Sequence, residues 1–381
     1  MIYLTYADPP SGVFSSQVND VCNYMNKNLD ANIRLVAFVS VRDFKKSKWK
    51  IKKEVPAAIV LPMLPKANYW KCSIPVFMLV CLVLGEKTVI ARGVLACNVA
   101  LGAKKTGVIK KLCYDGRGAI AAEWEEYKVA PYKNLIHTIE SLEKNAALKT
   151  DYRISISTKL IEYWKERFGY SGSAHVIIPC TLNSDFKGEL PSAEAMKKNR
   201  EDAGFHGDDL ILVYSGSVSG WQSFGILQGF LSPFLKENKS NKILFMSGED
   251  AHIKKMMDEF PGQVSCKWVE HRDVQKILSM CDYGILIREK SITSKVASPT
   301  KFAEYLSAGL KVLISEDIGD YSDFVKENNC GQVVKEKEKI KTERITPEEK
   351  QRMIELVTKY FTKTSQKENY KKLINEIRNK L

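Results

Sequence analysis

The segment from Ser298 to Ser315 constrains the fold of this chain more than any other stretch. Ser298 is placed as the N-cap of a helix, and Pro299 falls at the first helical position, where its missing N–H costs nothing. Apolar residues at helical spacing follow, and Gly309 can end the helix in a left-handed conformation. Residues 311–315 then have the apolar pattern of a short buried strand. The segment therefore predicts a loop, a helix and a strand of an α/β sheet.

The start of this predicted helix has the side chains of an anion site. A helix N-terminus presents unpaired N–H groups and a positive dipole end, which suit a phosphate. Thr300 opens the first turn, Lys301 adds a full positive charge, and Glu304 can accept hydrogen bonds from two neighbouring hydroxyls, such as those of a ribose. The alternative is an ordinary helix cap with Lys301 and Glu304 solvated. The position favours a nucleotide site, because ligands of α/β sheets bind where strands end and helices begin.

The motifs around this helix resemble the donor-binding signature of glycosyltransferase family 4, and most closely its branch of bacterial surface-polysaccharide enzymes. The resemblance rests on Ser298-Pro299-Thr300-Lys301, Glu304-Tyr305-Leu306, Ala308-Gly309, Val312-Leu313-Ile314 and Ile318-Gly319-Asp320. It implies an α/β protein with the GT-B fold, in which two Rossmann-like domains face each other across a cleft and a C-terminal helix crosses back to the first domain. It also implies transfer of a sugar from a nucleoside diphosphate sugar to an acceptor hydroxyl, with retention at the anomeric carbon and no obligate metal. Lys301 would then be the chief cation for the diphosphate.

The length of 381 residues is enough for two domains, each with its own core. We expect an acceptor-binding domain over 1–186, a nucleotide-sugar-binding domain over 187–360, and a final helix over 361–381 that packs on the first domain. The apolar stripe of Tyr370, Leu373, Ile374 and Ile377 suits that docking.

Cysteine usage and apolar runs favour a cytoplasmic protein. The nine cysteines form no CxxC pair and no Cys/His cluster at metal-ligand spacing, so we expect reduced thiols and no metal. Residues 2–6 read as a first strand and not as a signal peptide. The longest apolar run, 74–85, is about half as long as a membrane span and predicts a buried helix in preference to a membrane-contact helix.

The formal net charge of +13 is unevenly distributed along the chain. Residues 42–71 hold nine Lys/Arg against two Asp/Glu, and residues 335–381 hold fourteen against eight. The first patch is either a solvated surface or a contact with an anionic membrane, which would place the protein peripherally on the inner face of the plasma membrane. We expect no nucleic-acid partner, because no RRM, KH or zinc motif is present.

Further donor-side candidates come from other strand ends. The loop 215–222, with Gly216 and Ser217, is a second candidate diphosphate loop, although Trp221 and Gln222 stand where many family members carry Arg and Lys. Arg288 would then be a further cation. Val269 and His271 are where the resemblance places the base, with a surface histidine as the alternative for His271.

One family position departs from the pattern. Many relatives carry a glutamate eight residues before the one matched by Glu304, and this chain has Val296 there. The carboxylate that would hold a donor-sugar hydroxyl is therefore missing or replaced, with weak support for Glu289 as the replacement.

Acceptor-side candidates lie in the first half of the chain. The resemblance places the loop 7–13 beside both the donor diphosphate and the acceptor. Gly12 in this loop permits close backbone approach to the diphosphate, and Asp8 is a candidate acceptor-side carboxylate. Arg92 ends a predicted strand at 89–91. The turn Asp115-Gly116-Arg117-Gly118 and the following Glu123 resemble the family's acceptor loop, where many relatives carry a histidine near the position of Asp115. The alternatives are tight turns and a salt bridge from Arg117.

We therefore expect a glycosyltransferase with Lys301, Asp115 and Asp8 as catalytic candidates, no cofactor and no metal. The donor would be UDP- or GDP-linked and the acceptor lipid-linked or a growing glycan, in capsule, O-antigen or exopolysaccharide synthesis. The alternatives are a sugar-nucleotide epimerase on the same fold and a non-enzymatic basic protein that binds membrane or RNA. The sequence leaves the base, sugar, acceptor and linkage open.

Overall fold

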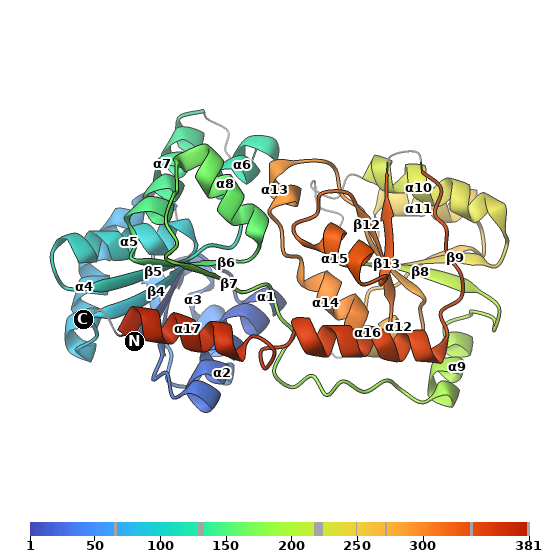
Figure 1. The fold of residues 1–381 in the computed structure, drawn as a ribbon, viewed down its shortest axis with the longest axis horizontal. Helices are drawn as coiled ribbons and strands as arrows, with labels where there is room; N and C mark the ends of the chain where they lie inside the picture. Colours follow the sequence, from blue (N-terminus) through green and yellow to red (C-terminus); the bar gives the residue numbers. More distant parts are fainter. Residues whose placement is uncertain are drawn as a thin grey trace. The chain divides into compact units, whose positions relative to one another are not determined.

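The structure, a computed structural model, describes residues 1–64, 67–128, 133–216, 224–248, 250–270, 273–335 and 338–378. It forms two compact units (Figure 1). Unit 1 comprises Met1–Ser184 and Lys363–Leu381, and unit 2 comprises Asp185–Thr362. The chain thus leaves unit 1 near the expected boundary at residue 186 and returns to it near the expected boundary at residue 360.

Unit 1 is a parallel sheet of seven strands with helices on both faces. The strand order is β3-β2-β1-β4-β5-β6-β7. The strands are β1 (Ile2–Tyr6), β2 (Arg34–Ser40), β3 (Ile59–Met63), β4 (Thr88–Arg92), β5 (Lys111–Asp115), β6 (Tyr152–Ser155) and β7 (His175–Ile177). The helices are α1 (Gly12–Phe14), α2 (Asp20–Leu29), α3 (Phe44–Glu54), α4 (Ser73–Leu84), α5 (Gly93–Lys105), α6 (Ile120–Glu126), α7 (Lys133–Lys149), α8 (Thr158–Phe168) and α17 (Lys367–Arg378).

Unit 2 repeats this architecture with a parallel sheet of six strands in the order β10-β9-β8-β11-β12-β13. The strands are β8 (Leu210–Ser215), β9 (Asn241–Met246), β10 (Val264–Cys266), β11 (Tyr283–Leu286), β12 (Lys311–Ser315) and β13 (Gly331–Val334). The helices are α9 (Ala193–Asp202), α10 (Phe224–Glu237), α11 (Ala251–Glu259), α12 (Val274–Ser279), α13 (Ile292–Lys295), α14 (Thr300–Ser307), α15 (Tyr321–Glu327) and α16 (Pro347–Tyr360).

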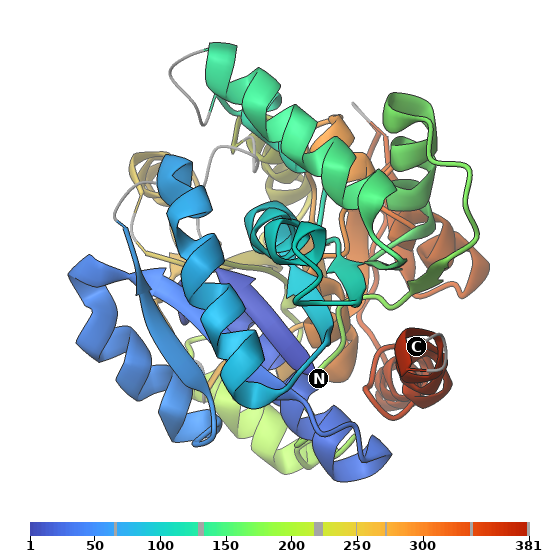
Figure 2. The ribbon, with the colours of Figure 1, turned by 90° about the vertical axis from the view of Figure 1, so that its left-hand side faces the viewer.

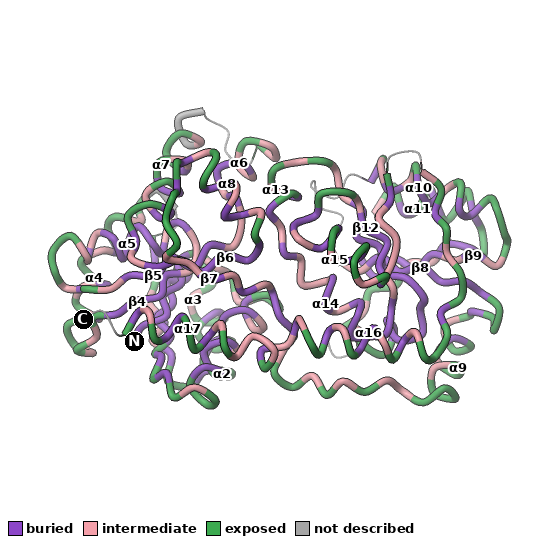
Figure 3. The backbone as a smooth tube through the Cα atoms, in the orientation of Figure 1, coloured by how far each residue is buried: buried purple, intermediate pink, exposed green. Residues whose placement is uncertain are grey.

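Apolar strands that helices cover on both faces explain why the sheets are parallel and buried. The central strands of both units are buried along most of their length (Figure 3). The resemblance predicted an α/β protein with two Rossmann-like domains, and the two doubly wound sheets confirm that fold class.

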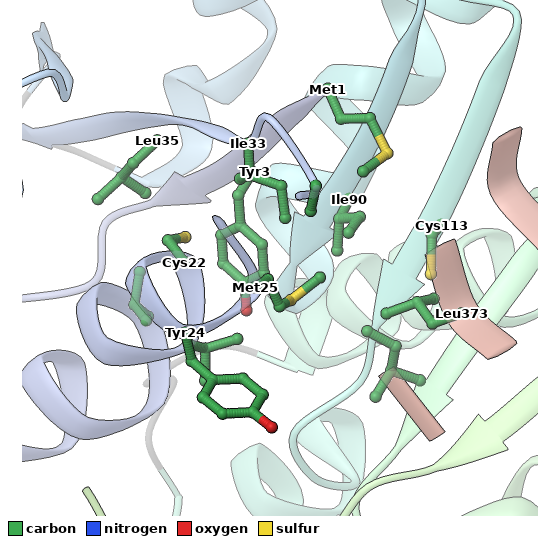
Figure 4. Close-up of a cluster of buried hydrophobic side chains, with 14 of the residues drawn as sticks. Met1, Tyr3, Cys22, Tyr24, Met25, Ile33, Leu35, Ile90, Cys113 and Leu373 are labelled. Atoms are coloured by element: carbon green, nitrogen blue, oxygen red, sulfur yellow. The ribbon is translucent and has the colours of Figure 1, made fainter. Parts of the chain in front are cut away.

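The last helix, α17, completes the core of unit 1. Tyr370, Leu373, Ile374 and Ile377 are at most 4% exposed and belong to the cluster that contains Tyr3 and Met25. Figure 4 shows Leu373 entering this cluster near Cys113, a residue of β5. The amphipathic stripe read from the sequence is the buried face of this helix, and α17 lies on unit 1 although it follows unit 2 in the chain (Figure 1).

The helix α4 corrects one expectation from the sequence. We expected a buried helix at 74–84, yet only Ser73, Phe77 and Cys81 are buried in α4. Its opposite side exposes four large apolar side chains, namely Val76 (45%), Leu79 (61%), Leu82 (64%) and Val83 (77%). An all-apolar helix carries no polar stripe to mark its solvent face, so its sequence could not reveal this exposure.

Each sheet has one switch point, where the strand order reverses and two neighbouring connections leave on opposite faces. It lies between β1 and β4 in unit 1 and between β8 and β11 in unit 2. Ligands of open α/β sheets bind at the carboxyl ends of strands at such points. Most of the described candidate residues lie at or beside one of these two places.

Candidate functional site

The donor-side candidates in unit 2 gather around the start of α14. The helix begins at Thr300, and its N-cap is Pro299, whose backbone is extended at φ −67° and ψ 126°. Ser298 is therefore not the N-cap, contrary to our expectation. Ser298 is buried, and its hydroxyl lies 2.7 Å from the hydroxyl of Tyr321. As predicted, Gly309 is left-handed at φ +77°, just beyond the end of the helix.

A buried tyrosine fixes α14 on the switch point. The hydroxyl of Tyr305 accepts a hydrogen bond from the backbone N–H of Ser215 (3.0 Å) and donates one to the carbonyl of Ile285 (3.2 Å). Ser215 ends β8 and Ile285 lies in β11. One side chain of α14 thus ties the helix to both strands that flank the switch point.

Lys301 lies over the end of β8. A Cβ atom at position 216 would lie only 2.2 Å from Lys301 Nζ, so a side chain there would displace the ammonium from this position. Gly216 also has φ +126°, a conformation that other residues rarely adopt. The Lys301 Nζ lies 5.1 Å from the ring centroid of Tyr214. The structure therefore brings together Gly216 and Lys301, two candidates that are far apart in the sequence.

The electrostatics around Lys301 suit an anion. The pKa of the Lys301 ammonium is lowered to about 8, mainly by burial and further by the nearby positive charge of Arg288, while Glu304 partly offsets both effects. Arg288 follows β11, and its backbone N–H donates to the hydroxyl of Ser315 at the end of β12 (2.8 Å). Two cations close enough to depress a pKa favour a ligand of opposite charge between them.

The turn after β12 fixes the loop before α14. Gly319 has φ +51°, and a Cβ there would lie 1.9 Å from the carbonyl oxygen of Ala297. The N–H of Gly319 donates to the carbonyl of Ser294 at 3.2 Å. Val296, in the same loop, is 1% exposed. The valine that replaces a family glutamate is thus a core residue of unit 2 and presents no polar group to a ligand.

The remaining donor-side candidates are less well defined by the structure. Ser217 and His271 lie outside the described residues. Val269 is half-buried beyond the end of β10, and its neighbour Trp268 is 70% exposed. Our sequence reading did not single out Trp268, although a tryptophan at the carboxyl end of a strand was a visible signal.

The acceptor-side candidates in unit 1 form a chain of alternating charges at the switch point between β1 and β4. Arg92 Nε lies 3.6 Å from Asp8 Oδ2, and Arg92 Nη1 lies 3.7 Å from Asp115 Oδ2. Arg117 binds the same carboxylate with two nitrogens, at 2.7 and 2.8 Å. The hydroxyl of Tyr3 also donates to Asp115 Oδ2.

This geometry gives the two aspartates different roles. The side chain of Asp115 has no exposed surface, whereas that of Asp8 is 40% exposed. Asp115 is therefore placed to hold Arg92 and Arg117, and its side chain has no surface open to a ligand. The sequence suggested a salt bridge from Arg117 as the alternative to an acceptor contact, and that salt bridge is present.

Two further candidates of unit 1 lie in first helical turns. Gly12 begins α1, where the side chain of Ser11 accepts a hydrogen bond from the N–H of Phe14 as the N-cap. Glu123 lies half-buried in the first turn of α6, and burial raises its pKa. Among the residues described, no group of three or more His, Cys, Asp or Glu side chains is arranged to hold a metal ion. The described helices also include none that combines the length and hydropathy needed to cross a membrane.

Comparison with solved structures defines the architecture. A glycosyltransferase from Rickettsia africae superposes with a TM-score of 0.71 at 14% identity, covering 100% of this chain and 99% of that one. HepE from Anabaena in complex with UDP gives a TM-score of 0.62 at 15% identity, covering 98% and 94%. A putative UDP-N-acetylglucosamine 2-epimerase from Listeria monocytogenes gives 0.53 at 10%, covering 98% and 90%. The chain has the GT-B fold, a fold that is not restricted to one reaction.

A family match defines the class of enzyme. Residues 231–377 match the family described as glucosyltransferase 3-like, C-terminal domain. This range takes in most of unit 2, including α14, and most of α17. Over residues 231–377 the chain is therefore similar to the C-terminal domain of glucosyltransferase 3-like enzymes, which supports a glycosyltransferase, while membership of family 4 remains a prediction.

Proposed function

We propose that this enzyme transfers a sugar from a nucleoside diphosphate sugar to an acceptor hydroxyl. The observation that carries the proposal is the position of Lys301, whose ammonium lies over Gly216 at the switch point of unit 2. Glu304 lies one turn further along the same helix. A diphosphate beside Lys301 would direct its ribose toward this carboxylate, which can accept from both ribose hydroxyls.

The chemistry of the step follows from this arrangement. The bond between the anomeric carbon and the diphosphate oxygen breaks, and a bond from the anomeric carbon to the acceptor oxygen forms. The diphosphate leaves with the electron pair, and the proton of the acceptor hydroxyl passes to the leaving diphosphate oxygen. Lys301, Arg288 and the N–H groups at the start of α14 stabilise the negative charge on the leaving group. With these cations the reaction proceeds without a metal, and we propose retention at the anomeric carbon from the family resemblance.

The uridine donor is the first candidate to test. HepE, which shares the fold, was crystallised with UDP, with UDP and glucose, and with UDP-glucose. UDP is therefore the first choice for the base, and GDP the second. The donor sugar stays unassigned because Val296 supplies no polar contact.

The test is the thermal stabilisation of the purified protein by UDP, GDP, ADP and CMP, measured in parallel with the Lys301→Ala variant. A ligand that binds only the folded protein raises its melting temperature. We expect UDP to stabilise the wild-type protein and to have little effect on the variant. Stabilisation by none of the four nucleotides, or equal stabilisation of both proteins, would exclude the proposed site.

An epimerase is the second candidate, because the same fold occurs in the putative Listeria enzyme. The two reactions differ in their requirement for an acceptor. A transferase releases the nucleoside diphosphate in proportion to glycosylated acceptor, whereas an epimerase converts a UDP-sugar into its epimer without an acceptor. Chromatography of UDP-sugars incubated with the enzyme alone distinguishes them.

For the acceptor we propose a lipid-linked or growing glycan of a capsule, O-antigen or exopolysaccharide, handled at an anionic membrane on its cytoplasmic face. The support is the combination of two surfaces beside β3, the edge strand of unit 1. The helix α3 before this strand carries six lysines, and α4 after it exposes the four apolar side chains described above. Apolar groups that enter the lipid and cations that attract its headgroups are the usual components of peripheral membrane binding. A basic RNA-binding protein would not need the apolar face.

A further inference from the structure

A cavity of about 280 Å³ opens in unit 1 at the carboxyl ends of β1, β2 and β3. Its walls come from the loop after β1, from the end of β2 with the first turns of α3, and from the end of β3. The chemistry-bearing side chains among its lining residues are Asp8, Ser40, Asp43, Lys46 and Lys50. None of these except Asp8 took part in the site described above.

Two lysines on one face of α3 give the cavity a positive side. Lys46 and Lys50 are four residues apart, so they lie one above the other on the helix. No carboxylate among the described residues lies within 4.0 Å of either ammonium. Two like charges at this spacing repel each other, and an anion bound between them removes that repulsion. This side of the cavity therefore suits a phosphate group, for which lysine is a common ligand.

Two carboxylates give the cavity a second side with different chemistry. Asp43 precedes α3, and Asp8 follows β1. Asp8 is held 3.6 Å from Arg92 Nε with 40% of its side chain exposed. Ionised carboxylates only accept hydrogen bonds, so they suit a ligand with hydroxyl groups. A sugar that carries a phosphate combines both requirements.

We propose that this cavity binds a phosphate-bearing sugar as the acceptor, with Lys46 and Lys50 on the phosphate and Asp8 and Asp43 on the hydroxyls. The inference rests on the proposed function, because it takes the cavity as the acceptor side of the transferase. The volume is at the lower end of the range of about 300–1,000 Å³ found for ligand pockets. The cavity therefore takes one phosphorylated sugar residue and leaves the rest of the acceptor outside.

The same helix provides a matched control. Lys48 and Lys52 have the same spacing as Lys46 and Lys50, and neither lines the cavity. The Lys48 ammonium lies 5.7 Å from the ring centroid of Phe44. K46Q/K50Q and K48Q/K52Q therefore remove the same charge from the same helix, and only the first pair changes the cavity.

The experiment is titration calorimetry of the full chain with glucose 1-phosphate, glucose and inorganic phosphate, in the presence of saturating UDP. The titrations are repeated without UDP in the Lys301→Ala variant, so that binding at the donor site is excluded in two independent ways. We expect glucose 1-phosphate to bind most tightly, about tenfold more weakly to K46Q/K50Q, and unchanged to K48Q/K52Q. Asp43→Asn should reduce the preference for glucose 1-phosphate over inorganic phosphate.

The outcomes separate the cavity from the proposed function. No binding of glucose 1-phosphate to the wild-type protein, or equal losses in the two double variants, would overturn the cavity proposal. UDP binding should be the same in the wild-type protein and both double variants. A protein that binds glucose 1-phosphate through Lys46 and Lys50 but fails to bind any nucleotide would instead refute the transferase assignment and leave the cavity as a sugar-phosphate site.

A second arm identifies where the phosphate comes from. The octyl phosphodiester of glucose is compared with glucose 1-phosphate in the same titration. Tighter binding of the octyl compound supports a sugar carried on a lipid phosphate, and equal binding supports a phosphate on a water-soluble or polymeric sugar. Both compounds should bind about tenfold more weakly to K46Q/K50Q, and unchanged binding of either to that variant counts against the cavity.

Discussion

At the scale of single residues, the position of Lys301 in a helix could be predicted from the sequence, whereas its neighbours in the folded protein could not. Its place in the first turn of a helix was visible in the spacing from Pro299 to Gly309. Its contact with Gly216 was not, because the fold brings together two positions far apart in the chain. At Gly216 the φ of +126° favours glycine, and a side chain there would displace the Lys301 ammonium, whereas the sequence alone left this residue as one glycine among several in a loop.

The lowered pKa of Lys301 predicts how donor binding depends on pH. The diphosphate binds the protonated ammonium, whose pKa is about 8 in the unliganded protein. UDP affinity should therefore be constant from about pH 6.5 to 7.5 and fall above pH 8, approaching tenfold per pH unit. Calorimetry at several pH values measures this. Lys301→Arg is the control, because a guanidinium stays charged across the range and its UDP affinity should not change.

The free energy of unfolding of the unliganded protein should rise with pH above 8, whereas the UDP affinity falls. The folded-state pKa of Lys301 is lowered from an unfolded value of about 10.4, so the unfolded chain binds the extra proton between pH 8 and that value. Lys301 therefore contributes stability that is gained as pH rises through this window.

A UDP affinity that stays flat from pH 7 to 9 in the wild-type protein would show that the Lys301 ammonium does not carry the binding.

Residue types alone also misassigned some roles. Ser298 had the sequence of an N-cap, yet Tyr321 from a later helix engages its hydroxyl. Asp115 had the sequence of an exposed turn carboxylate, yet two arginines and Tyr3 enclose it. In both positions the deciding partner comes from elsewhere in the fold, so local pattern could not identify it.

At the scale of elements, individual strands were the more predictable part. The apolar runs at 2–6, 89–91 and 311–315 located β1, β4 and β12, because parallel strands are buried on both faces and lack alternation. The buried face of a helix was less predictable where all of its side chains are apolar. The exposed face of α4 is the clearest example, and it has a consequence that can be measured.

We predict that α4 inserts into anionic membranes through its exposed face. Leu79 and Leu82 are 61% and 64% exposed, and transferring most of a leucine side chain out of water is worth about 1–2 kcal/mol. L79Q/L82Q should therefore reduce partition onto vesicles rich in phosphatidylglycerol by about tenfold or more. Sedimentation with the vesicles measures the bound fraction.

The control for α4 is Leu148→Gln, which changes another leucine of unit 1 that is 37% exposed on α7. This variant should partition like the wild-type protein. K48Q/K52Q should weaken partition at low salt and much less at high salt, because screening reduces the attraction of exposed cations to the surface. Equal partition of L79Q/L82Q and the wild-type protein would return α4 to an ordinary solvated helix.

At the scale of the whole molecule, the path of the chain matters more than either sheet. Unit 1 is made from the first 184 residues and the last 19, with all of unit 2 between them. Its core stays open until α17 docks, because that helix supplies four residues of the buried cluster. The segment before α17 adds polar anchors, since Lys363 Nζ lies 2.6 Å from Asp20 Oδ2 and donates to the carbonyl of Leu182 at 2.7 Å. Unit 1 can therefore complete its fold only after α17 has been synthesised.

This arrangement predicts that a substitution in the last helix unfolds the first unit. Leu373 is fully buried in the cluster of unit 1, and a buried unpaired carboxylate there costs several kcal/mol, a large part of the about 5–15 kcal/mol that stabilises a typical domain. Leu373→Asp should lower the melting temperature of unit 1 by more than about 10 °C and make residues 1–184 sensitive to protease. UDP stabilisation of unit 2 should persist, because the site around Lys301 lies wholly within that unit. The exposed Lys371→Gln on the same helix should leave both units unchanged, and a protease-resistant unit 1 in Leu373→Asp would mean that α17 is dispensable for its core.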